Sequence, residues 1–269
     1  MDLTKSLDFI KKELINNKDF NTSYLLGSSA KIELSNKSKT KYISKILYMS
    51  AASRSGINMC PFSTKTCRDV CLGHTSGHAA MTKNGDKTNL VEVARLKRSL
   101  LYIHDRENFL KKLKNEVKNL VKYSKERGLK PVVRLNGTTD LPVETWGVFK
   151  EFPRVKFYDY TKSKSRMIQF LNGKFPKNYY LVYSYSPENK QVASEILALG
   201  GNVACVFDEK KSKKRKLSYI GKRFLGHTII DGDSHDLRFL DKQGGYVVGL
   251  SKKGKIKNNP FFISLKEVK

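Results

Sequence analysis

Apolar residues recur at helical spacing in the first half of the chain, and this pattern predicts three helices. The first is expected over residues 3–16 and the second over Lys87–Ile103. The third begins after Asp105, a residue suited to a helix cap, and ends at Gly128. Between the first two helices, Ile46–Met49 is a short apolar run that predicts a buried strand.

From residue 131 onward, short apolar runs alternate with segments that are compatible with helices. Strands that are apolar on both faces and alternate with helices are typical of a mainly parallel sheet. We therefore predict an α/β fold with βα repeats, either a partial barrel of the TIM type or an open doubly wound sheet. The predicted strands are Pro131–Leu135, Val155–Tyr160, Tyr180–Tyr185, Asn202–Phe207, Thr228–Asp231 and Tyr246–Leu250, and the predicted helices between them are Val143–Glu151, Ser163–Leu171 and Asn189–Leu199.

No internal repeat and no linker divides the 269 residues, so we expect a single α/β domain. Residues 1–50 form its N-terminal helix and lead-in segment, and residues 51–80 form a loop rich in cysteine. Residues 81–255 supply the helices and the βα-repeat core, and residues 256–269 a C-terminal tail. The basic tract Lys210–Lys216 is expected to be an exposed loop.

The cysteine loop holds three of the four cysteines, with the spacing Cys60-x6-Cys67-x3-Cys71. Small and turn-forming residues surround them between Gly56 and His78, which indicates a segment folded around a metal centre. Three thiolates without a nearby fourth leave one coordination position open. This favours a [4Fe-4S] cluster with one free iron.

Zinc is the alternative metal, because His74 or His78 completes a tetrahedral site with three cysteines and one histidine. Such a structural zinc site also suits a basic protein that binds nucleic acid. A third interpretation is three small buried thiols without a metal. Cys205 lies inside the apolar run VACVF and is interpreted as a core residue.

Polar side chains gather where the predicted strands end, at the edge of a parallel sheet where ligands bind. Arg134 lies on a buried strand and needs a partner: it pairs with Asp159 or Asp208, or it binds a carboxylate or phosphate. The turn DGDSHD over Asp231–Asp236 either binds a divalent metal or is only a turn with internal hydrogen bonds. His235 in that turn is a proton donor, a metal ligand or a turn residue.

The chain carries 52 Lys and Arg against 25 Asp and Glu, a formal net charge of +27. Such a field attracts DNA or RNA and makes their binding depend strongly on salt, although scattered lysines also occur on ordinary solvated surfaces. Clustered cysteines do not form a disulfide framework. We find neither a signal peptide nor a run of the ~20 apolar residues that cross a bilayer, so we expect a soluble protein without a membrane partner.

Seven runs of the sequence together resemble the phage gene product 88 domain family, over about Tyr42 to Lys255. They are LYMSAASRSGINMCPFSTKTCRDVCL, ARLKRSLLYIHDRENFLKKL, PVVRLNGTTDLPVE, VKFYDYTK, YYLVYSYS, DGDSHDLRFLD and VVGLSKKGK. The family is similar to radical S-adenosylmethionine (radical-SAM) enzymes in placing a three-cysteine loop before a βα-repeat region. The resemblance implies a phage or mobile-element protein in the cytoplasm of a bacterial host. Val70 stands where radical-SAM enzymes usually have an aromatic residue, and their usual spacing is C-x3-C-x2-C.

The leading hypothesis is a radical-SAM-like enzyme with a [4Fe-4S] cluster and S-adenosylmethionine, acting on a nucleotide or nucleic acid. The alternative is a zinc-stabilised basic protein of the DNA-binding, nuclease or replication type. The oligomeric state is left open. The predicted residues are Cys60, Cys67 and Cys71 as metal ligands; Asp140, Asp159 and Lys162 for catalysis; Asn136, Thr138, Ser184 and Ser186 for the cofactor; and Arg134, Asp231, Asp233 and His235 for the substrate.

Overall fold

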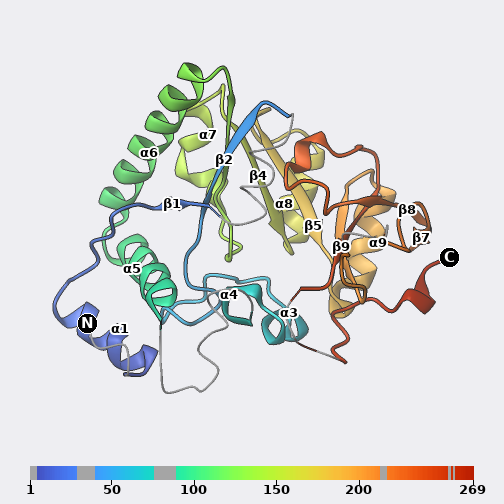
Figure 1. Cartoon of the computed structure of the whole chain (residues 1–269), viewed down its shortest axis with the longest axis horizontal. Helices are drawn as coiled ribbons and strands as arrows, with labels where there is room; N and C mark the ends of the chain where they lie inside the picture. Colours follow the sequence, from blue (N-terminus) through green and yellow to red (C-terminus); the bar gives the residue numbers. More distant parts are fainter. Residues whose placement is uncertain (1–4, 29–39, 76–88, 213–216, 254–255, 257) are drawn as a thin grey trace.

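A nine-stranded sheet runs through the molecule in the order β1-β2-β3-β4-β5-β6-β9-β8-β7 (Figure 1). It is seen in a computed structural model that describes residues 5–28, 40–75, 89–212, 217–253, 256 and 258–269. Strands β2 to β6, β9 and β8 pair in parallel, whereas the short edge strands β1 and β7 pair antiparallel. The strands are β1 Leu26–Gly27, β2 Tyr42–Leu47, β3 Lys130–Arg134, β4 Lys156–Thr161, β5 Tyr179–Ser184, β6 Val203–Phe207, β7 Arg223–Phe224, β8 His227–Asp231 and β9 Val247–Ser251.

Helices fill most of the connections between the parallel strands, and several short 3-10 turns lie at strand ends. The α-helices of the described residues are α1 Leu7–Asn16, α3 Lys65–Asp69, α4 Leu72–Thr75, α5 Leu90–His104, α6 Arg106–Glu126, α7 Val148–Glu151, α8 Lys164–Leu171 and α9 Lys190–Ala198. The 3-10 helices are η2 Val143–Trp146, η3 Pro187–Asn189, η4 Arg238–Leu240 and η5 Leu265–Glu267. No helix in these parts of the chain has both the length and the apolar character needed to cross a bilayer.

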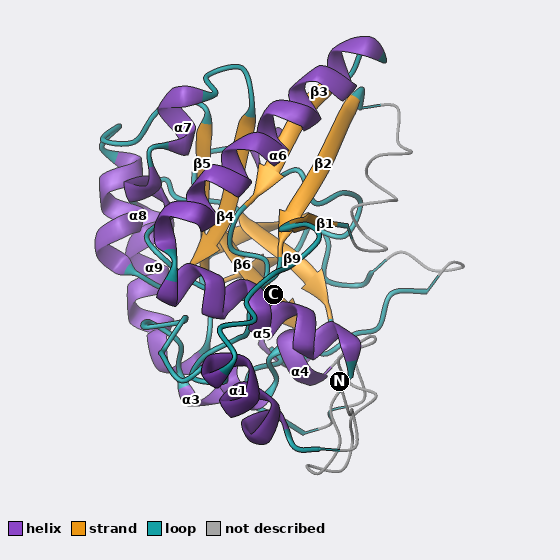
Figure 2. Cartoon of the chain, turned by 90° about the vertical axis from the view of Figure 1, so that its left-hand side faces the viewer, coloured by secondary structure: helices purple, strands orange, loops and turns teal. Residues whose placement is uncertain are grey.

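Helices α6, α7, α8 and α9 cover one face of the sheet (Figure 2). Phe157 and Leu181 of that face share a single large core with Leu113 of α6. The opposite face carries Tyr158, which packs with Leu237 beside η4. Strands β2 to β6 lie side by side in chain order, and crossovers of the usual right-handed kind place the helices that connect such strands on the same face. The predicted mainly parallel α/β sheet is confirmed, and it is not closed.

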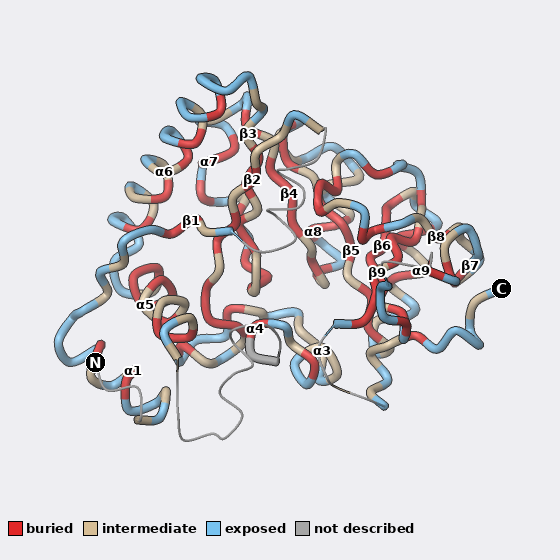
Figure 3. The backbone as a smooth tube through the Cα atoms, in the orientation of Figure 1, coloured by how far each residue is buried: buried red, intermediate tan, exposed pale blue. Residues whose placement is uncertain are grey.

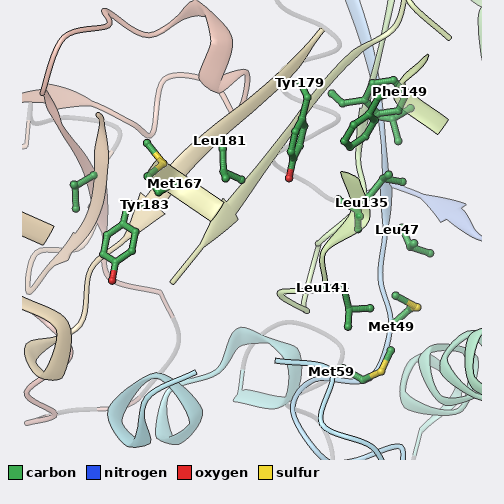
Figure 4. Close-up of a cluster of buried hydrophobic side chains, with 14 of the residues drawn as sticks. Leu47, Met49, Met59, Leu135, Leu141, Phe149, Met167, Tyr179, Leu181 and Tyr183 are labelled. Atoms are coloured by element: carbon green, nitrogen blue, oxygen red, sulfur yellow. The ribbon is translucent and has the colours of Figure 1, made fainter. Parts of the chain in front are cut away.

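Buried positions follow the strands and the inward stripes of α5 and α6 (Figure 3). Phe109 of α6 is fully buried and meets two other rings, with centroid distances of 5.2 Å to Tyr102 and 5.6 Å to Trp146. Close to the strand ends, Met59 of the cysteine loop joins Met49 in the same core (Figure 4). The core therefore extends from the helical layer to the cysteine loop.

The predicted strands from residue 131 onward are confirmed with bounds that shift by about one residue. The strand predicted at Ile46–Met49 was placed too late, because β2 begins at Tyr42 inside a stretch with few apolar residues. The helix predicted from Lys87 begins at Leu90, after the cap Asn89, and residues 81–88 lie outside the described part. The first helix begins at Leu7, later than predicted.

Two short helices, α3 and α4, occur where the sequence predicted only a loop. None of the five residues of α3 is buried, so this helix has no apolar periodicity to detect. The sequence feature that marks the start of α3 is its N-cap residue, Thr64. The Thr64 hydroxyl accepts a hydrogen bond from the Cys67 backbone N–H at 3.3 Å. The two-residue edge strands β1 and β7 are too short to give a pattern.

We expect Phe109→Ala to lower the free energy of unfolding by about 3–5 kcal/mol, because it empties a fully buried ring site between Tyr102 and Trp146. The exposed Tyr123 on the same helix offers a matched control, and Tyr123→Ala should cost less than about 1 kcal/mol. Urea unfolding followed by circular dichroism measures both variants. Equal losses for the two would contradict this placement of the core.

Candidate functional site

The cysteine loop lies on the edge of the sheet where the parallel strands end, so α3 and α4 stand below the arrowheads in Figure 1. The turn after β3 joins it there: the Asp140 backbone N–H donates to the Met59 carbonyl at 3.0 Å, and the Thr138 hydroxyl donates to the Met49 carbonyl at 2.5 Å. A Cβ at Gly137 would come within 2.6 Å of a carbonyl oxygen of β2. Glycine at this position therefore allows the turn to approach β2 closely.

A second set of contacts fixes the loop to the end of β5. The Thr64 hydroxyl donates to the Ser186 hydroxyl at 3.1 Å. The carboxylate of Glu188 accepts from both the backbone N–H and the hydroxyl of Thr66, at 3.0 and 2.7 Å. These bonds hold the pKa of Glu188 at about 2, although burial works in the opposite direction. The loop therefore spans the edge from β3 to β5, and Thr138 and Ser186, both predicted cofactor residues, anchor it.

Cys60, Cys67 and Cys71 are partly buried cysteines within this loop. The Cys60 sulfur lies 3.4 Å from the Ala52 backbone N–H, which donates to it, and the Cys71 sulfur accepts from the Gly73 N–H at 3.4 Å. Burial raises the pKa of all three thiols, that of Cys60 to about 12. Neighbouring cysteines raise the pKa values of Cys60 and Cys71 further. Without a bound metal the three groups are therefore protonated at neutral pH.

Positive side chains surround these thiols. The ammonium group of Lys162 lowers the pKa of Cys67, against the effect of burial. Arg95 and Arg54 do the same for Cys71. Arg95, on α5, donates to the Gly73 carbonyl, and its guanidinium lies 5.2 Å from the centroid of the Tyr48 ring. Acidic neighbours act in the opposite direction, because Asp140 raises the pKa of Cys60 and Cys67, and Glu188 raises that of Cys67.

No three His, Cys, Asp or Glu side chains among the described residues converge on a position for a single metal ion. This applies both to the cysteines and to the acidic turn at Asp231–Asp236. His74 and His78 were the alternative predictions for a fourth zinc ligand. His78 and the side chain of His74 lie outside the described part.

Lys162 and Ser184, two residues predicted for the site, meet at the ends of β4 and β5. The ammonium nitrogen of Lys162 donates to the Ser184 carbonyl at 2.9 Å, to its hydroxyl at 3.0 Å and to the Tyr185 carbonyl at 3.0 Å. All three protons therefore have acceptors. Burial lowers the pKa of Lys162, and the nearby Cys67 and Asp140 oppose that shift. The backbone N–H of Lys162 also donates to the Asp140 carboxylate at 2.9 Å.

Asp140 is held by Arg166, a residue that sequence reasoning did not select. One guanidinium nitrogen of Arg166 donates to Asp140 at 2.7 Å, while two others bind both oxygens of Glu144 at 2.9 and 2.8 Å. Burial raises the pKa of Asp140, and the charge of Arg166 opposes this. A single arginine in a basic chain carries no local signal, since its partners lie 22 and 26 residues away.

Asp159 and Asn136 form the inner support of the turn after β3. Asp159 is fully buried, and its carboxylate accepts the Asn136 backbone N–H at 2.6 Å and the Tyr179 hydroxyl at 3.4 Å. The Asn136 side-chain amide donates to the Leu141 carbonyl at 3.0 Å. Its oxygen accepts the Leu141 backbone N–H at 2.9 Å and the Thr139 hydroxyl. Both side chains therefore fix the turn, and their roles in catalysis and cofactor binding stay predictions.

Arg134 pairs with Asp236 at 3.5 Å, and not with Asp159 or Asp208 as predicted. It lies on the face of the sheet opposite to the helices, with its guanidinium 4.5 Å from the centroid of the Tyr160 ring. The Tyr158 hydroxyl donates to the same Asp236 carboxylate at 2.6 Å. The prediction missed this partner because the two residues are 102 positions apart.

The remaining predicted substrate residues lie in the turn after β8. The Asp231 carboxylate accepts the Asp233 backbone N–H at 2.8 Å, and the Asp233 carboxylate accepts the Ser251 N–H at 2.6 Å. His235 lies 3.9 Å from Asp241. These bonds hold the turn against the end of β9, in agreement with the alternative that Asp231–Asp236 is a turn with internal hydrogen bonds. Substrate binding by Asp231, Asp233 and His235 stays a prediction.

The stability contributed by Asp159 should fall as the pH rises. Burial raises its pKa from the ordinary 3.8 to about 7, although Arg134, the Asn136 N–H and Arg166 oppose the shift. Between about pH 4 and pH 7 the folded chain holds a proton here that the unfolded chain has released, so raising the pH through this window weakens the fold. We expect the unfolding free energy of the wild type, relative to Asp159→Asn, to decrease from pH 4.5 to pH 7.5.

Urea unfolding of both proteins across this range tests the expectation, with Glu107→Gln on the exposed start of α6 as a charge-matched control. A wild-type advantage that is constant or increases with pH would show that Asp159 is ionised in the folded protein.

The family model described as Gene product 88 matches residues 23–264, which include every strand from β1 to β9 and the whole cysteine loop. No curated protein and no solved structure matches the chain. Because the match extends over most of its length, the chain belongs to the gene product 88 family.

Proposed function

We propose that this phage-family protein is an iron–sulfur enzyme of the radical-SAM type, with a [4Fe-4S] cluster bound by Cys60, Cys67 and Cys71. One observation carries the proposal: three partly buried cysteines lie in a single segment that is fixed to the strand-end edge of a parallel sheet. A cluster held by three thiolates supplies an iron with an open coordination position, where S-adenosylmethionine can bind.

The surroundings of the cysteines fit such a group. Burial raises the pKa of the three thiols, so their deprotonation needs a strong positive partner. The three cysteines lie close enough for their charges to interact, because Cys67 and Cys71 both raise the pKa of Cys60. Arg95 and Lys162 then offset the negative charge of a thiolate-ligated cluster.

The other residues of the edge position this centre. Lys162 ties the ends of β4 and β5 together and brings positive charge to Cys67. Asp140 joins the turn after β3 to the loop and is itself held by Arg166. The formal net charge of +27 supports a polyanionic substrate, so we infer a nucleotide or nucleic acid.

Anaerobic purification should yield a brown protein that contains iron and sulfide in the proportions of a [4Fe-4S] cluster. Cys67→Ala should lose most of the iron and the visible absorbance while keeping its far-ultraviolet circular dichroism, because α3 buries no residue of the core. Cys205→Ala is the matched control. Its thiol is fully buried in β6, so iron content should stay at the wild-type level.

A colourless protein with stoichiometric zinc would contradict the proposal. It would favour the alternative of a zinc-stabilised, basic nucleic-acid-binding protein, for which the high positive charge is the supporting observation. Cys67→Ala would then unfold the loop and its surroundings, since the binding free energy of a structural zinc contributes directly to folding.

A further inference from the structure

A cavity of about 80 Å³ lies beside the cysteine loop. Val70 and Leu72, which flank Cys71, form one wall of this cavity. Val206 of β6 and Leu250 of β9 lie on another side. The volume exceeds the roughly 10–15 Å³ that one water needs. Ser251 and Lys253 also line the cavity, but its other side chains are apolar and give water few partners. An apolar group should therefore displace water here at little cost.

Two adjacent aromatic rings, Phe261 and Phe262, complete the lining. Both are partly exposed, and their centroids are 5.9 Å apart in an edge-to-face arrangement. The next residue, Ile263, is buried in the main core and bound to β6, since its backbone N–H donates to the Val206 carbonyl at 2.9 Å. The segment is thus anchored by Ile263, while its two rings line the cavity.

Two lysine side chains lie over these rings. The ammonium nitrogen of Lys252 lies 4.5 Å from the centroid of Phe262, and that of Lys162 lies 5.5 Å from the centroid of Phe261. Lys253 lines the cavity and is exposed to solvent. Lys162 and Lys252 are bound to other groups, the latter to Asp208 at 2.7 Å, whereas Lys253 is exposed. Aromatic faces hold single-stranded nucleic acid by stacking on its bases, and an exposed lysine beside them can bind the phosphate.

We propose that one unpaired base of a nucleic-acid strand stacks against Phe262 at the mouth of this cavity, with its edge in the cavity and Lys253 near the backbone phosphate. The inference rests on the proposed function and names its substrate as single-stranded or locally opened nucleic acid. A paired base cannot enter, because its faces are covered within the duplex. The base then lies on the same edge of the sheet as Cys71 and Lys162.

A single-stranded oligonucleotide containing 2-aminopurine tests this proposal with the anaerobically prepared full chain. Binding should quench the probe through stacking and should be tighter than binding of the matched duplex. Phe262→Ala should weaken binding by roughly 5- to 150-fold, the range for loss of one stacked base. Tyr123→Ala, which removes an exposed ring on α6, should leave it unchanged.

Phe262→Leu keeps the apolar volume and removes the aromatic face, so it should retain the fold and lose the quenching. Equal affinity for single strand and duplex, or equal effects of Phe262→Ala and Tyr123→Ala, would overturn the inference. So would loss of S-adenosylmethionine binding in Phe262→Ala with oligonucleotide affinity intact, since the cavity would then serve the cofactor's nucleoside.

Iron content measured on the same preparations separates the two proposals. A protein with its full iron content that shows no base stacking refutes the base pocket alone. Zinc in place of iron, together with Phe262-dependent quenching, refutes the iron–sulfur assignment and leaves the base pocket standing.

Discussion

The hydrogen bond from the Asn136 backbone to the buried Asp159 carboxylate is the contact on which the strand-end edge depends. It fixes the start of the turn after β3, and the remainder of that turn carries Thr138 and Asp140 to the cysteine loop. Losing this acceptor would leave a buried N–H unsatisfied, at a cost of about 1–3 kcal/mol, and would weaken the attachment of the loop to the end of β3.

Charge compensation explains much of the rest of the edge. Arg166 forms ion pairs with both Asp140 and Glu144, and Lys162 donates its protons to carbonyl and hydroxyl oxygens. The positive charge of Lys162 is therefore not consumed by a carboxylate bonded to its ammonium group, although Asp140 is near. Lys162 and Arg95 thus bring positive charge to Cys67 and Cys71, while Asp140 and Glu188 bring negative charge to Cys67.

The sequence predicted the parallel strands well because each is a short apolar run between turn residues, and this signal is local. It also brought Lys162 and Ser184 into one site, since both follow strand ends. It missed Arg166, and it missed the pairing of Arg134 with Asp236, because such contacts join residues far apart in the chain. Phe261 and Phe262 were assigned to a tail, because nothing local shows that Ile263 anchors them to β6.

Val70 and Leu72 belong to two neighbourhoods at once. They flank a cysteine of the candidate metal centre, and they form one wall of the apolar cavity. A metal group that orders Cys71 would therefore also order Val70 and Leu72 in the cavity wall. A molecule that fills the cavity would in turn restrain Cys71. Linkage makes this effect reciprocal, so occupancy of either position should tighten binding at the other.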